Sequence, residues 1–162
     1  MRQNFYRQII YCTKISERNF SKMNKSTDEL LNILKNTSNI SSYMQNQAEN
    51  LTIFSPCEYL ENLLSKKSLS KSECIKQSGL DRTYCYQIFS GIKTPSRDKL
   101  LALSFGMKLT TDEVQQLLKH TGYSPLYPRD KRDSILLFAF NRRLSIEDAN
   151  ALLFEMEFTL LL

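Results

Sequence analysis

The sequence predicts an all-α protein, and three observations support that fold class. Helix-capping patterns of the form S/T-x-x-E recur, each followed by apolar residues three or four positions apart. They begin at Ser26, Ser70 and Thr110, with a relative at Ser145 that carries the shorter Asp148. The apolar-polar alternation of strands is nearly absent. The chain also holds only 4 Gly and 4 Pro among 162 residues, which disfavours a sheet protein with many turns.

The N-terminal part divides into two stretches. The first 25 residues show no helical period and no caps, and they carry an excess of Lys and Arg. Two interpretations stay open for them: a flexible basic arm, or an upstream stretch included because Met23 is the true start. Residues 26–55 then predict an N-terminal helical segment. Within it, the polar stretch 36–42 predicts a break before a second short helix around 44–54.

Residues 56–109 predict the central domain. After a first amphipathic helix, the second helix begins at the Ser70 cap and ends at Gly79, a residue suited to the left-handed conformation that closes helices. Asp81 can cap a third helix, which stops before Gly91. Two short helices joined by a tight turn containing Gly are typical of helix-turn-helix geometry.

Residues 110–162 predict a C-terminal helical extension. The stretch 122–128 contains a glycine and two prolines and is expected to connect two helix ends. The helix over 129–141 is apolar nearly all round, which predicts that it is buried, either in this chain or against a second one. Together with the apolar residues after 151, it forms either a surface for homodimerisation or core packing within the monomer.

One internal similarity lies in this extension. Residues 109–113 and 144–148 share an apolar residue followed by a capping pattern, and each leads into a Leu-Leu pair. An internal repeat and a coincidence of two similar caps both fit this similarity. We favour the coincidence.

The sequence lacks the residue patterns of metal sites, of common enzyme active sites and of membrane spans. Cys12, Cys57, Cys74 and Cys85 include no C-x-x-C pair, and His120 is the single histidine, so no metal site is expected. Reduced thiols in the core are favoured over two disulfides. No Gly-rich phosphate loop or nucleophile elbow is present, which predicts no enzyme and no cofactor. The sequence contains no run of about 18 apolar residues, so no membrane span is expected. No secretory signal is recognisable either, and we therefore expect a cytoplasmic protein.

Within residues 57–106 the sequence is similar to a known family. The matching text is Leu69-Ser70-Lys71-Ser72-Glu73, Ser78-Gly79-Leu80-Asp81-Arg82-Thr83, Gln87-Ile88-Phe89-Ser90-Gly91-Ile92-Lys93-Thr94-Pro95-Ser96, Leu100-Leu101-Ala102-Leu103-Ser104 and Gly106. It resembles the Cro/C1-type, XRE-like helix-turn-helix family. The connector from Gly122 to Asp133 and the last helix also look like the C-terminal part of helix-turn-helix proteins from Gram-positive bacteria.

The resemblance implies a λ-repressor-like core of five helices and binding to double-stranded DNA as a transcriptional regulator. Family members often dimerise to meet an operator with two half-sites. The third helix would enter the major groove, with its outward residues toward base edges. The residues at those positions are Arg82, Thr83, Tyr86 and Gln87. Contacts to phosphate would come from Lys71, Lys93, Thr94 and Arg97.

A second function stays open beside DNA binding. The third helix carries Tyr84, Tyr86 and Phe89, and exposed aromatic residues are enriched at protein interfaces. The net charge of residues 56–128 is only +3, which is modest for a strong DNA binder. These features favour an adaptor or antitoxin-like module that binds a protein partner in place of DNA.

Overall fold

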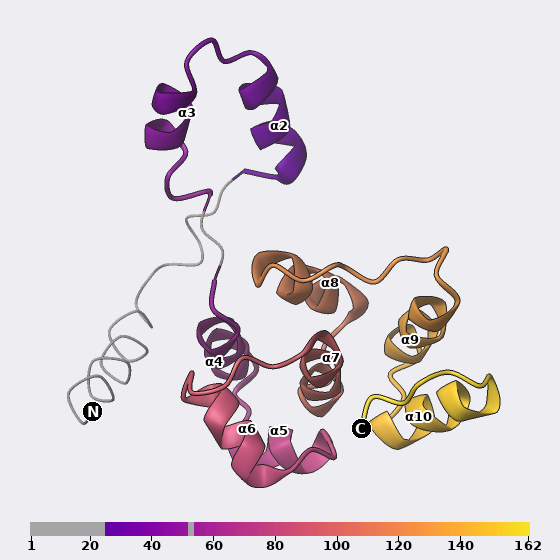
Figure 1. The fold of residues 1–162 in the computed structure, drawn as a ribbon. Helices are drawn as coiled ribbons and strands as arrows, with labels where there is room; N and C mark the ends of the chain where they lie inside the picture. Colours follow the sequence, from indigo (N-terminus) through magenta and orange to yellow (C-terminus); the bar gives the residue numbers. More distant parts are fainter. Residues whose placement is uncertain (1–24, 52–53) are drawn as a thin grey trace. The chain divides into compact units, whose positions relative to one another are not determined.

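The computed structural model describes residues 25–51 and 54–162. Apart from Lys25, the predicted basic arm lies outside these residues. The described residues belong to two compact units, one formed by 25–51 and the other by 54–162. All regular elements in these ranges are α-helices, as the sequence predicts (Figure 1).

The smaller unit pairs two short helices, α2 (Thr27–Lys35) and α3 (Ile40–Asn46). The Ser26 capping box forms as expected. The predicted break is shorter than expected, because Asn39 Oδ1 accepts a hydrogen bond of 2.9 Å from the Ser41 amide and starts α3 inside the polar stretch. Tyr43 of α3 is buried, and its hydroxyl lies 3.5 Å from the Leu30 carbonyl of α2.

The larger unit contains seven of the described helices. They are α4 (Pro56–Lys67), α5 (Lys71–Gln77), α6 (Arg82–Phe89), α7 (Arg97–Gly106), α8 (Thr111–His120), α9 (Lys131–Asn141) and α10 (Ile146–Glu155). The reciprocal capping boxes expected at Thr110 and Ser145 form, whereas Ser70 only accepts the Glu73 amide. Ser55 and Glu58 form a further box that the sequence analysis did not single out, although Ser-x-x-Glu is present there.

Helix α7 lies at the centre of this unit, between the α4–α6 side and the α9–α10 side (Figure 1). Leu100, Leu101 and Leu103 are fully buried, so α7 presents apolar residues to neighbours all round. Its last residue, Gly106, meets α5 so closely that a Cβ there would stand 2.3 Å from the Cys74 carbonyl oxygen. The glycine therefore permits the close crossing of α5 and α7. Ile75 of α5 is buried as well.

The preference for coincidental caps over an internal repeat was wrong. The hairpin α7–α8 and the hairpin α9–α10 correspond residue by residue at a constant spacing of 35 positions, and that register covers the connections as well as the caps. Identical pairs in this register are Arg97/Arg132, Asp98/Asp133, Leu101/Leu136, Phe105/Phe140, Leu109/Leu144, Leu117/Leu152 and Leu118/Leu153. The two residues that close the helix corners, Lys108 and Arg143, share a positive φ of 51° and 55°.

The segment that follows each hairpin is held in the same way. The side chain of Gln115 accepts a 2.7 Å hydrogen bond from the Leu126 amide and donates one of 2.7 Å to its carbonyl. In the second hairpin the equivalent Asn150 accepts a bond of 2.9 Å from the equivalent amide, that of Leu161. Leu126 and Leu161 are both buried. The repeated polar contact therefore holds one buried leucine, Leu126 or Leu161, against each hairpin.

The helix predicted over 129–141 is buried by its own chain on one face, and its burial against a second chain stays a prediction. Leu136, Ala139 and Phe140 face the core, but the Phe138 side chain is 50% exposed. In α10, Leu153 is buried, while Phe154 is 74% exposed. Within the part of the chain that the structure describes, no helix combines the length and apolarity needed to cross a membrane.

Candidate nucleic-acid interface

Helix α6 is anchored by one face and open on the other. Cys85 and Ile88 are fully buried, and Phe89 is 3% exposed, so these residues form the inner face against α4 and α5. Phe89 therefore does not add to an exposed aromatic surface, contrary to the expectation from sequence. An inner face packed in this way fixes the direction in which the outer side chains point.

The buried cysteines of this region are reduced, as the sequence favours. Cys57, Cys74 and Cys85 are buried and form no disulfide, while Cys12 lies outside the described residues. Burial raises the pKa of the Cys74 thiol to about 12, and it also raises the pKa of the Cys85 thiol. Both side chains are therefore protonated core residues at neutral pH.

The turn between α5 and α6 is built from local polar contacts. Ser78 is buried and donates its hydroxyl to the Ile75 carbonyl at 2.8 Å. Gly79 follows with a φ of 65°, a conformation that favours glycine. Asp81 then caps α6 by accepting a 2.7 Å hydrogen bond from the Tyr84 amide. The order of helix, glycine turn and cap agrees with the sequence prediction.

Three of the predicted base-reading residues lie together on the exposed face of α6. Arg82, Thr83 and Tyr86 are exposed, and Gln87 is half-buried beside them. The guanidinium carbon of Arg82 lies 5.7 Å from the centre of the Tyr86 ring, one helical turn away. Stacking on this ring holds the guanidinium on the surface, where its planar donors could meet the two acceptors of a guanine edge.

A rigid loop carries Lys93 and Thr94 next to this face. The Gln87 carbonyl accepts hydrogen bonds from the amides of Ile92 at 2.9 Å and Lys93 at 3.0 Å, which continue the end of α6 into the loop. At the other end of the loop, the Tyr123 hydroxyl donates to the Pro95 carbonyl at 2.5 Å. Lys93 and Thr94 are exposed between these two fixed points, and the Lys93 ammonium lies 5.2 Å from the Tyr84 ring centre.

Lys71 begins α5 and is only partly available to a phosphate. Its ammonium forms an ion pair with Glu61 of α4 and lies 5.6 Å from the centre of the Phe89 ring. The neighbouring carboxylate offsets the positive charge that a phosphate contact would use. Lys71 stands beside the exposed face of α6 but contributes less attraction than an unpaired lysine.

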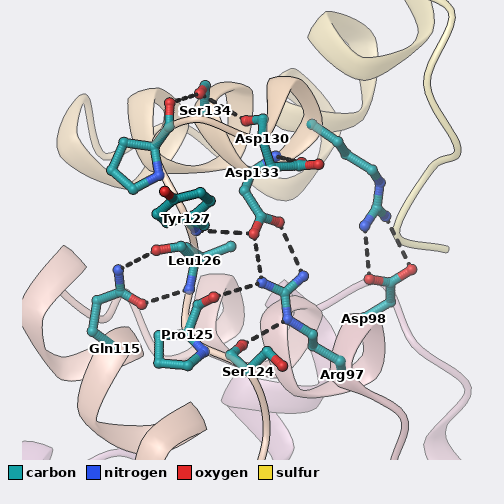
Figure 2. Close-up of polar contacts among 12 residues, drawn as sticks. Arg97, Asp98, Gln115, Ser124, Pro125, Leu126, Tyr127, Asp130, Asp133 and Ser134 are labelled. Carbon is teal, nitrogen blue, oxygen red and sulfur yellow. Dashed lines mark hydrogen bonds and ion pairs between the residues drawn. The ribbon is translucent and has the colours of Figure 1, made fainter.

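The interpretation of Arg97 as a phosphate contact needs correction. Its guanidinium forms a two-point contact with Asp133, with nitrogen-oxygen distances of 3.0 and 2.8 Å (Figure 2). The remaining donors reach the carbonyls of Ser124 at 2.9 Å and Pro125 at 3.3 Å. Because these partners are all within the chain and the side chain is only 24% exposed, Arg97 joins the two hairpins and leaves the candidate interface.

His120, the last residue of α8, packs against two aromatic rings. Its ring stacks on Tyr59 of α4 with centroids 5.6 Å apart, and Phe54 meets it edge-on at 6.3 Å. Burial, with a smaller contribution from Lys119, lowers the pKa of this imidazole. Among the described residues, no group of His, Cys, Asp and Glu could hold a metal ion.

A second arginine-aspartate pair, Arg132 with Asp98, was not predicted from the sequence. Arg132 forms the matching two-point contact with Asp98, at 3.0 and 2.9 Å, and its Nε donates to the Thr159 carbonyl at 2.9 Å. The signal was present in the sequence, because Arg97-Asp98 and Arg132-Asp133 are the same dipeptide in the 35-residue register.

Comparison with protein families, with curated proteins and with solved structures finds no match to this chain.

Proposed function

We propose that the chain binds double-stranded DNA in a sequence-specific manner, as a cytoplasmic transcriptional regulator with a λ-repressor-like helix-turn-helix. The observation that supports it most directly is the exposed face of α6, where Arg82, Thr83 and Tyr86 stand free of intramolecular ion pairs in the described structure. Helix α6 would lie in the major groove with its N-terminal residues toward the bases.

Base contacts and phosphate contacts would come from different residues. Arg82 would read guanine through O6 and N7, and Gln87 would read adenine, while Thr83 and Tyr86 would contact thymine methyl groups or phosphate. Lys93 and Thr94, on the fixed loop after α6, would contact phosphate, with Lys71 as a weaker contributor. Phosphate contacts would orient the domain, and the α6 contacts would supply the discrimination between sequences.

The test begins with selection from a pool of randomised duplexes, followed by fluorescence anisotropy on the selected duplex and on a scrambled one. The wild-type chain is expected to prefer the selected duplex by a factor of about 10³ or more. In Arg82→Ala this preference is expected to fall by about 1–3 kcal/mol, the value of one bidentate base contact.

Arg142→Ala is the matched control. Arg142 is exposed on α9 and lies 5.6 Å from the Phe138 ring centre, so the substitution removes the same charge and the same kind of ring contact. It is expected to leave the preference unchanged. Failure to enrich any sequence, or equal losses in both variants, would contradict the proposed function.

A protein-interaction module is the second candidate, and the exposed apolar residues of the C-terminal hairpin favour it. Phe138, Phe154 and Met156 are all at least half exposed, and Tyr86 is 40% exposed on α6. Such residues could serve a homodimer or an adaptor or antitoxin-like contact. Light scattering of the wild-type chain and of Phe154→Ser separates self-association from contact with another protein. A wild-type dimer that dissociates in the variant assigns the α10 surface to self-association.

A further inference from the structure

A pocket of about 450 Å³ opens where the corners of the two repeated hairpins meet the end of α5. Three pairs of its lining residues are equivalent in the 35-residue register: Phe105 with Phe140, Lys108 with Arg143, and Leu109 with Leu144. Two equivalent corners of the repeated hairpins therefore line a single cavity. None of the residues assigned above to DNA binding lines it.

The base of the pocket is apolar and closely packed. The rings of Phe105 and Phe140 stack with centroids 4.0 Å apart and an angle of 15° between their planes. Leu109 and Ile146 beside them are almost fully buried. The edges of these residues and the half-buried Leu144 line the pocket. An apolar group that entered it would release water without displacing a polar partner.

The rim of the pocket is cationic. Lys76, Lys108 and Arg143 are exposed, and in the described part of the chain none of them forms an ion pair. Glu147 is the one carboxylate among the lining residues. The left-handed backbone at Lys108 and Arg143, described above, places both at the ends of helices, where their stems begin beside the pocket.

We propose that this pocket binds a small amphipathic organic anion. Its aromatic or acyl body would lie against Leu144 and the edges of Phe105 and Phe140, and its carboxylate or sulfonate would be held by Lys108 and Arg143. Arginine is suited to the planar, two-point contact with such a group, and lysine adds a second charge. This assignment is independent of DNA binding, since it uses other residues and a different kind of ligand.

The test uses 1-anilinonaphthalene-8-sulfonate, whose fluorescence rises on entering an apolar site, and N-phenyl-1-naphthylamine, which has the same rings without the sulfonate. The wild-type chain is expected to bind the anion saturably with one site, and more tightly than the neutral compound. In Lys108→Gln/Arg143→Gln the affinity for the anion is expected to fall at least tenfold, with the affinity for the neutral compound unchanged.

Arg142→Gln is the matched charge control, because Arg142 neighbours Arg143 but lies against Phe138 outside the pocket. It is expected to bind both probes as the wild-type chain does. Ile146→Trp, which would fill the base of the pocket, is expected to weaken both probes, and circular dichroism checks that each variant remains helical. No saturable binding, equal loss in Arg142→Gln, or equal affinity for both compounds would overturn the proposal.

Discussion

Arg97 and Asp133 face each other across the two repeated hairpins, with two nitrogen-oxygen contacts of 3.0 and 2.8 Å. The reciprocal pair, Arg132 and Asp98, makes the same contact in the opposite direction. Each hairpin therefore gives its arginine to the aspartate of the other, and Figure 2 shows the Arg97 half of this exchange with its backbone partners. An exchange of this kind couples the folding of α7–α8 to that of α9–α10.

We predict that Asp133→Asn destabilises the protein by about 3 kcal/mol, because it leaves the partly buried Arg97 guanidinium without its counter-charge. The substitution also weakens the hydrogen bond of 3.0 Å from the Tyr127 amide to Asp133 Oδ2. Urea denaturation followed by circular dichroism measures the free energy of unfolding.

Lys67→Gln is the control for that measurement. Lys67 Nζ and Glu113 Oε2 lie 2.9 Å apart, but the two side chains are 25% and 35% exposed, so solvent screens the ion pair. Its removal is expected to cost less than about 1 kcal/mol. An Asp133→Asn effect as small as this would show that the exchange does not hold the hairpins together.

Gly106→Ala is predicted to destabilise the chain, although alanine is the better helix former by about 1 kcal/mol. The added Cβ would stand 2.3 Å from the Cys74 carbonyl oxygen, a backbone atom that cannot move without displacing α5. We expect a loss of about 1–3 kcal/mol or more in thermal or urea unfolding.

Gly79→Ala provides the comparison. A Cβ there meets Leu162 Cδ1 at 2.9 Å, the end of a flexible side chain, while the φ of 65° adds backbone strain of about 1 kcal/mol. A larger loss for Gly79→Ala than for Gly106→Ala would contradict the assignment of the tight crossing to α5 and α7.

The stability of the larger unit is predicted to fall as the pH drops below 6.5, the ordinary pKa of histidine. The pKa of His120 is lowered in the folded chain, so below pH 6.5 the unfolded chain binds the proton first and is favoured. His120→Phe keeps a ring against Tyr59 without a titrating group. The difference in melting temperature between pH 7.5 and pH 5.5 is expected to be smaller in this variant; an unchanged difference would assign the pH dependence elsewhere.

Lys93→Ala is predicted to weaken DNA binding about equally for the selected and the scrambled duplex, as expected for a phosphate contact. The slope of log affinity against log salt concentration is expected to decrease by about one unit. Lys119→Ala, an exposed lysine on α8, is the control and is expected to leave the slope unchanged. A change of sequence preference in Lys93→Ala would indicate a base contact instead.

Local signals in the sequence predicted much of the helical structure. Ser70, Asp81 and Thr110 start helices where their side chains can cap amide groups, and Gly79 ends one, because these effects depend on residues within one turn. The outward positions of Arg82, Thr83 and Tyr86 came from the family resemblance and not from a local signal, and all three residues are exposed. Asn39 is a further local cap, and α3 therefore begins earlier than the sequence predicts.

Other features depended on contacts between distant segments. Arg97 looked like any basic residue at a helix start until the fold brought Asp133, 36 positions away, to its guanidinium. The same holds for Gly106, whose role exists only because α5 crosses it, and for His120, which the fold places against Tyr59. No pattern within one helix records the neighbour that a side chain will meet.

The sequence by itself determined the all-α class, the positions of most helix starts, and the burial of the cysteines at positions 57, 74 and 85, since capping and apolar periodicity act over a few residues. The 35-residue register of the two C-terminal hairpins is also written in the sequence, but only the tertiary structure showed that they exchange their arginines and that their corners line one pocket. The physical reason is range: ion pairs, close helix crossings and cavities are made by residues that only the folded chain brings together.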